Sequence, residues 1–205
     1  MLTSDFLARF GAMVFGAALA VAAPATWAQT TSESSDQTGS DTIELSLGEE
    51  ADPQVGQSYA KEIYDDWEMR CLRTENPAED PCQMYQLVND KEGNPVAEVS
   101  MFRLPEGGQA KAGATVVVPL ETALQKRLTI QIDGNKAKQY PFSFCNPWGC
   151  YARIGLTEED IALYQRGAVA KVVITAMVAP NDPVELDVSL KGFTKAFQNA
   201  SVVQQ

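Results

Sequence analysis

Short runs in which apolar and polar residues alternate fill most of the chain beyond residue 64. Alternation places successive side chains on opposite faces of an extended backbone, so each run is typical of a half-buried β-strand. Segments rich in Gly, Pro, Asn and Asp separate the runs and predict turns. Strands are therefore expected at residues 67–72, 82–88, 96–104, 114–118, 127–133, 139–144, 169–178 and 184–190. This pattern predicts an all-β domain, a β-sandwich of about eight to ten short antiparallel strands.

Two segments show helical signals in place of alternation. In the first, Thr157 is a suitable N-cap, acidic residues follow it, and Gly167 stands where a left-handed residue would end the helix. The second helix is expected at about residues 192–199, where it would cap an open end of the sandwich. Between the strands, Asp133-Gly134 predicts a two-residue hairpin turn.

The first 28 residues are predicted to be a secretory signal peptide. Residues 10–23 carry no charge and are mostly small or apolar, Arg9 precedes them, and small residues end the segment near Ala28. A helix of this length extends about 21 Å, which is short of the roughly 30 Å of a bilayer's hydrocarbon core. The mature chain is therefore expected to start near Gln29, in an oxidising compartment, and to keep no membrane span.

Residues 29–62 are polar and acidic, and few of them are apolar. Such a composition cannot bury enough apolar surface to offset the entropy lost on ordering, so a disordered acidic arm is expected. Residues 43–47 alternate, but five residues are too few to predict a strand. The β-sandwich domain is predicted to occupy residues 63–205.

The net charge of -11 and the absence of histidine argue against several classes of function. A chain with 16 basic and 27 acidic residues lacks the clustered cations that phosphate contacts require, which argues against nucleic acids and anionic membrane surfaces as partners. Without histidine, neither Ser-His-Asp nor Cys-His catalysis can occur. No metal or other cofactor is expected.

Four cysteines, Cys71, Cys82, Cys145 and Cys150, allow three disulfide pairings. Cys71 ends one predicted strand and Cys82 begins the next, so a hairpin would bring them within bonding range. Cys145 and Cys150 flank a tight turn that also folds back on itself. We therefore predict the disulfides Cys71–Cys82 and Cys145–Cys150, in preference to a redox-active pair or a zinc site, which favour other spacings.

Trp148 lies inside the turn that the second cysteine pair closes. A large aromatic side chain there either covers an edge of the core or stands out as a binding anchor. We expect the first arrangement and keep Trp148 as a candidate for a binding surface. The loops at residues 76–80 and 105–109 are further candidates, because loops carry many binding residues.

Five short motifs follow one another along the folded part of the chain. They are Tyr64-Asp65-Asp66-Trp67 with Cys71 beyond it, Cys82 followed by Gln86, Val118-Pro119-Leu120 followed by Asp133-Gly134, Cys145 with Gly149-Cys150, and Ser189-Leu190-Lys191-Gly192-Phe193 with Ala196. In this order and spacing, residues 64–200 resemble the invasion-associated locus B proteins of alphaproteobacteria. Asp65 and Glu121 depart from the pattern, since glycine is expected at both positions in that family.

The resemblance implies an exported β-sandwich protein with disulfides, located in the periplasm or at the cell surface. No catalytic residue belongs to the family's motifs, so none is implied here. The first hypothesis is therefore a non-enzymatic envelope or interaction protein, which would aid envelope integrity or host-cell interaction through a partner that the sequence does not identify.

Two alternatives remain open. One is a periplasmic carrier that holds a small ligand inside the sandwich, which would need a large apolar cavity. The other is an enzyme acting on envelope polymers, which would need two carboxylates about 5–9.5 Å apart in a cleft. The candidate carboxylates are Asp65, Asp66, Glu158, Glu159 and Asp160.

Overall fold

A computed structural model of the chain describes residues 46–49 and 51–203. The predicted signal peptide (1–28) and residues 29–45 of the predicted arm lie outside the described residues, so both remain predictions. All strands and helices belong to one compact unit, which begins at Glu49. The two described α-helices, of nine and seven residues, are too short and polar to cross a bilayer.

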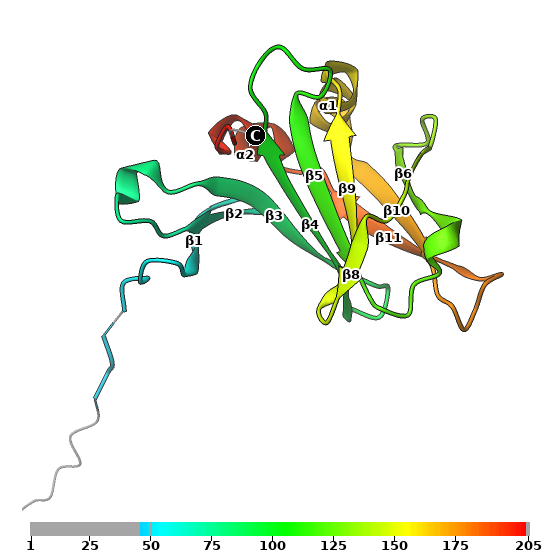
Figure 1. The fold of residues 1–205 in the computed structure, drawn as a ribbon, viewed down its shortest axis with the longest axis horizontal. Coiled ribbons are helices and arrows are strands. Elements are labelled where there is room, and N and C mark those ends of the chain that lie inside the picture. The colour runs from blue at the N-terminus through cyan, green and yellow to red at the C-terminus, as the bar shows by residue number, and fades with distance from the viewer. Residues whose placement is uncertain (1–45, 50, 204–205) are drawn as a thin grey trace, which may run out of the picture. The chain divides into compact units, whose positions relative to one another are not determined.

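Within the described residues, eleven strands form two antiparallel sheets, and two short α-helices lie at one end of them (Figure 1). The strands are β1 (Ser58–Tyr64), β2 (Trp67–Leu72), β3 (Cys82–Asn89), β4 (Pro95–Arg103), β5 (Ala112–Val118), β6 (Leu128–Ile132), β7 (Lys138–Tyr140), β8 (Phe144–Asn146), β9 (Gly149–Leu156), β10 (Val169–Thr175) and β11 (Pro183–Ser189). The helices are α1 (Glu158–Arg166) and α2 (Phe193–Asn199), and single 3-10 turns occur at Pro77–Glu79 and Leu124–Lys126. The larger sheet has the order β1-β2-β3-β4-β5-β9-β8 and the smaller sheet the order β11-β10-β6-β7. The predicted all-β fold is confirmed.

The two sheets pack face to face through the apolar side chains of alternating residues. Met101, Ala114 and Ile154 on the larger sheet line the same interior space as Val172 and Val188 on the smaller sheet. The volume left among these side chains is only about 10 Å³, the least that a single water molecule needs. The space lined by these side chains therefore offers no room for a small ligand.

Each predicted strand has a counterpart in the structure, but the alternation pattern misses two strands. β1 begins at Ser58, so the predicted arm (29–62) is wrong at its C-terminal end, where exposed residues pair with β2 as an edge strand. β9 lies between β5 and β8, and its glycines, Gly149 and Gly155, weaken the strand signal because glycine is uncommon in strands. The single strand predicted at 139–144 divides into β7 and β8 on either side of Pro141.

The predicted hairpin at Asp133-Gly134 is present but has a longer loop than two residues. Asp133 and Gly134 have positive φ angles of 43° and 73°, and the Asn135 amide donates to the Ile132 carbonyl oxygen at 2.8 Å. Pairing between β6 and β7 nevertheless stops before this tight turn. The Asp133 carboxylate instead accepts from the backbone amides of residues 168 and 169, which fixes the start of β10.

Helix α1 begins as predicted and ends differently. The side chains of Thr157 and Asp160 form a capping box with the backbone of the first turn. Gly167 has a φ angle of -77°, so the prediction of a left-handed residue is wrong. A Cβ atom on Gly167 would lie 2.7 Å from Ile132 Cγ2 and 2.8 Å from Leu190 Cδ1. Glycine is therefore needed there because the helix end packs against both side chains.

One buried group of side chains joins the two sheets through hydrogen bonds. Gln86 on β3 donates from Nε2 to the Ser189 carbonyl oxygen (3.1 Å) and accepts at Oε1 from the Ser189 amide (2.9 Å). Trp67 on β2 is fully buried and donates from Nε1 to the same carbonyl oxygen (2.9 Å). Ser189 ends β11, the outermost strand of the smaller sheet, so these side chains satisfy backbone groups that lack a neighbouring strand.

The segment after Ser189 packs directly on the turn between β1 and β2. Gly192 has a φ angle of 83°, and a Cβ atom there would come within 2.0 Å of the Tyr64 carbonyl oxygen, so only glycine fits. Phe193 packs edge-on against Trp67, with ring centroids 5.7 Å apart. Asp65 has a φ angle of 53°. Glycine adopts such a positive φ angle with the least strain, which agrees with the glycine expected at this position in the family. The first and last motifs of the sequence therefore meet in space.

Replacing Gln86 by leucine, which has a similar size, should destabilise the domain. The Ser189 amide would lose its acceptor while remaining partly buried, so we expect the free energy of unfolding to fall by about 2 kcal/mol. Urea denaturation followed by tryptophan fluorescence measures this change.

Gln83→Leu is the matched control for this experiment. Gln83 lies on the same strand as Gln86, but its side chain is on the opposite face and makes no hydrogen bond to another described residue. Equal denaturation midpoints for the two variants would contradict the role assigned to Gln86.

Candidate functional site

Asp65 and Asp66, two of the candidate catalytic carboxylates, make structural contacts at the turn between β1 and β2. Asp66 Oδ2 accepts a hydrogen bond from the Ser189 hydroxyl at 2.6 Å. Asp65 forms an ion pair with Lys191, with a distance of 3.4 Å between Oδ1 and Nζ. Both side chains thereby help to hold the last motif of the chain against the first.

The other three candidate carboxylates belong to the first turn of α1. Glu158 and Glu159 are exposed there and interact favourably with the helix dipole. Asp160 is buried, caps the helix and pairs with Lys138. Burial alone would raise the pKa of Asp160, but the hydrogen bonds from Lys138 and Thr157 hold it below its ordinary value. This carboxylate is therefore not poised to donate a proton near neutral pH.

Both disulfides join residues that face each other across neighbouring strands. Cys71–Cys82 links β2 to β3 and Cys145–Cys150 links β8 to β9, in the predicted pairing, each with a Cα–Cα separation of 4.0 Å. In the chain-entropy model, the loops that they close stabilise the fold by about 3 and about 2 kcal/mol, respectively. Among the described residues, no group of His, Cys, Asp and Glu side chains could hold a metal ion.

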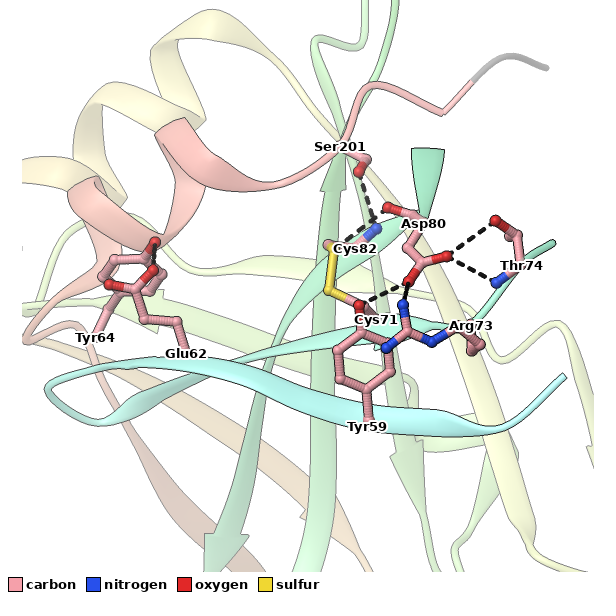
Figure 2. Close-up of a disulfide and its surroundings, with 9 residues drawn as sticks. All are labelled: Tyr59, Glu62, Tyr64, Cys71, Arg73, Thr74, Asp80, Cys82 and Ser201. Carbon is pink, nitrogen blue, oxygen red and sulfur yellow. Dashed lines mark hydrogen bonds and ion pairs between the residues drawn. A yellow bond between two sulfur atoms is a disulfide. The ribbon is translucent and has the colours of Figure 1, made fainter. Parts of the chain in front are cut away.

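Asp80 is a buried carboxylate beside the first disulfide (Figure 2). It accepts hydrogen bonds from the Tyr59 hydroxyl (2.7 Å), Arg73 Nη1 (2.9 Å), and the amide and hydroxyl of Thr74 (2.7 and 2.9 Å). Burial alone would raise the pKa of Asp80, but these donors hold it below its ordinary value. The candidate binding loop at residues 76–80 is thus fastened to the domain by its last residue.

The C-terminal part of the described chain lies beside the same disulfide (Figure 2). The Cys82 amide donates to the Ser201 hydroxyl, and the Ser201 amide donates to the Cys82 carbonyl oxygen, both at 2.8 Å. On the other side, the Arg103 amide donates to the Ser201 carbonyl oxygen at 3.1 Å. Residues 201–203 therefore bridge the start of β3 and the end of β4.

Trp148 does not cover the core, contrary to our expectation, because its side chain is 84% exposed. β8 ends at Asn146 and β9 begins at Gly149, so Pro147 and Trp148 make up the whole turn. β8 is the last strand of its sheet, and no further strand lies beside it for the indole to pack against. The structure places Trp148 in the exposed position that the alternative interpretation required.

Three features constrain the Trp148 turn. The Cys145–Cys150 disulfide closes its base. Phe144 stacks on Tyr151, with ring centroids 4.6 Å apart, which ties β8 to β9. A Cβ atom on Gly149 would lie 2.6 Å from the Val118 carbonyl oxygen, so the turn approaches β5 closely. Trp148 is therefore an exposed side chain on a rigid support.

A shallow groove of about 280 Å³ runs beside Trp148 on the outer face of the larger sheet. Across the strands, Leu87 on β3 faces Glu98 on β4, and Glu98 faces Val117 on β5. The groove is lined by Leu87, Pro95, Val96, Ala97, Glu98, Val117, Val118, Pro119 and Trp148. We call this surface the Trp148 groove.

The Trp148 groove was not predicted from the sequence, although one signal of it was present. In β3, the side chains of Gln83, Tyr85 and Leu87 lie on the outer face of the sheet. Leu87 is apolar, and its side chain is nevertheless 48% exposed. A single exposed leucine is common on protein surfaces, so this signal alone did not identify the groove. The other candidate loop, at residues 105–109, joins β4 to β5 and is mostly exposed.

Comparisons with known proteins agree with one another. The sequence model of the family described as "Invasion associated locus B (IalB) protein" matches residues 67–201. Two invasion protein B homologues, from Brucella abortus strain 2308 and from Brucella abortus biovar 1 strain 9-941, are each 28% identical to this chain over 141 residues. Each alignment covers 69% of this chain and 79% of the relative.

A solved structure shares the fold. The crystal structure of invasion associated protein B from Bartonella henselae matches with a TM-score of 0.55 and 24% sequence identity. The match covers 66% of this chain and 90% of the Bartonella chain in that structure.

Replacing Asp80 by asparagine should destabilise the domain at neutral pH. In acid, the substitution should no longer change the stability. Because the pKa of Asp80 is lowered by folding, its contribution is fully present above the unfolded-state pKa of about 3.9. The contribution is lost as the pH falls through the lower folded-state pKa. Urea midpoints of the wild type and Asp80→Asn should therefore converge between about pH 6 and about pH 2.

Asp187→Asn serves as the control, because Asp187 is an exposed carboxylate on β11. Its midpoints should differ from those of the wild type by less than those of Asp80→Asn. A difference between the wild type and Asp80→Asn that does not change with pH would contradict the assigned role of the Asp80 carboxylate.

Proposed function

This chain belongs to the invasion associated locus B family, and we propose that it is an exported protein which acts by binding a partner, without catalysing a reaction. The family description supports a part in the contact between a bacterium and its host. The two disulfides support export, because disulfides form and persist in oxidising compartments outside the cytoplasm.

The single observation that carries this proposal is the exposed indole of Trp148 on its rigid turn. Tryptophan is among the residues most enriched at the positions that dominate the energy of protein interfaces. Covering one such side chain buries about 150–250 Å². Because the turn is already held by a disulfide and a stacked aromatic pair, binding would cost little conformational entropy.

Two other features support binding over the alternative functions. The space between the sheets that Met101, Val172 and Val188 line is too small for the ligand that a carrier would hold. Asp66 and Asp160 are engaged in short hydrogen bonds within the fold, which makes them poor candidates for catalytic acids. We therefore propose a protein partner in the bacterial envelope or on a host cell, and the net charge of -11 argues against a nucleic acid.

Photo-crosslinking in intact cells tests the proposal. The photoreactive residue p-benzoylphenylalanine is introduced in place of Leu120, which is 55% exposed and follows the groove residue Pro119. We expect one discrete adduct after irradiation, and we expect Trp148→Ala in the same chain to reduce its yield at least about fivefold, as loss of an interface anchor would.

The matched control is the same photoreactive residue in place of Val178, an exposed apolar residue in the turn between β10 and β11. This position should give no adduct of the same mass. Equal labelling from both positions, or an adduct at position 120 that does not depend on Trp148, would refute binding at this surface.

A further inference from the structure

We propose that the Trp148 groove binds an extended peptide segment in which one arginine or lysine lies among apolar side chains. This inference rests on the proposed function and names the chemistry of the partner. It follows from two features of the groove that both favour a cation, namely the Glu98 carboxylate and the exposed face of the Trp148 indole.

Glu98 is the only charged residue among those that line the groove. Its direct neighbours across the sheet are Leu87 on one side and Val117 on the other, and both are apolar. The ion pairs of the described chain involve other carboxylates, and no described side chain donates a hydrogen bond to Glu98. A partner that covers this carboxylate with apolar groups alone would remove it from water without compensation, which is strongly unfavourable. A positive charge in the partner would compensate Glu98 most strongly.

Trp148 favours the same charge. The face of an indole attracts a guanidinium or ammonium group, and tryptophan does so more strongly than the other aromatic residues. In the described part of the chain, no arginine or lysine lies over the Trp148 ring, whereas Arg70 lies over Tyr85 and Arg153 over Phe144. The Trp148 indole is thus an unoccupied cation-binding face in the same groove as the unpaired carboxylate of Glu98.

The other residues that line the groove are apolar, so they favour binding of an extended peptide with several apolar side chains. Leu87, Glu98 and Val117 lie on three adjacent strands, so the row spans about 10 Å at the usual strand spacing. An extended peptide places alternate side chains on one side about 6.5–7 Å apart, so three to five of its residues cover this row. Arginine should bind better than lysine, because its planar group stacks on aromatic rings and pairs with carboxylates through two parallel hydrogen bonds.

Four libraries of synthetic heptapeptides test the inference on the purified, disulfide-bonded protein. Each library has a fixed central residue, Arg, Lys, Leu or Glu, and the other positions are varied among Val, Leu, Thr and Ser. We expect retention by the immobilised protein in the order Arg, Lys, Leu, Glu, with about tenfold between the first and the last. This difference should shrink in about 1 M NaCl, since salt screens the ion pair.

Three variants assign the preference to the groove. Glu98→Gln keeps the shape of the side chain and should reduce the Arg-over-Glu ratio at least about threefold, while Trp148→Ala should lower retention of the Arg library at least about threefold. Asp187→Asn changes the net charge equally but lies on the other sheet, so it should leave the ratio unchanged. An unchanged ratio in Glu98→Gln, or best retention of the Leu library by the wild type, would overturn the inference.

The two proposals fail in different ways. Absence of a Trp148-dependent adduct at position 120 in cells refutes the proposed binding function, whatever the libraries show. A Trp148-dependent adduct combined with retention that does not depend on Glu98 leaves the binding function standing and refutes only the basic character of the partner.

Discussion

The side chain of Gln86 supplies the edge of one sheet with the hydrogen bonds that a neighbouring strand would otherwise provide. Apolar contacts between two sheets have little direction and would allow the sheets to slide. An amide that both donates to and accepts from one backbone position, with Trp67 bonded to the same carbonyl oxygen, has a strict geometry. This contact fixes β11 over β3, and thereby sets which residues of the two sheets face each other.

The position of β11 also determines where the chain goes next. Directly after Ser189, the backbone turns onto the β1–β2 hairpin at Gly192, and Phe193 reaches Trp67 as the first residue of α2. The inner face of the larger sheet is then covered by the smaller sheet and by this helix. Its outer face remains available, and this is where the Trp148 groove lies. Because the smaller sheet and α2 cover only the inner face of the larger sheet, its outer face remains accessible to a partner.

The sequence was sufficient for those features that depend on local patterns. Alternation located most strands, the spacing of Cys71 and Cys82 across a hairpin gave their pairing, and Thr157 marked the start of α1. In each case the residues that make the pattern are the ones that make the contact.

Features that depend on distant neighbours could not be predicted in this way. Position 167 is occupied by glycine because Ile132 and Leu190 approach it from other elements. Gly155 lies within β9, although glycine is rare in strands. Trp148 is exposed because β8 is the last strand of its sheet, a fact of topology that its local sequence does not contain. The groove likewise requires Leu87, Glu98 and Val117 to be aligned by the register of three strands.

The bridge that residues 201–203 make between β3 and β4 has a consequence for the order of events during biogenesis. The Cys71–Cys82 hairpin is complete early in synthesis, so its disulfide can form from contiguous sequence. The native surroundings of that disulfide, in contrast, include Ser201, more than a hundred residues later. A chain that emerges N-terminus first, from a ribosome or through a translocation pore, therefore reaches its closed state only after nearly the whole family domain has appeared. Until then the start of β3 lacks the hydrogen bonds that Ser201 supplies.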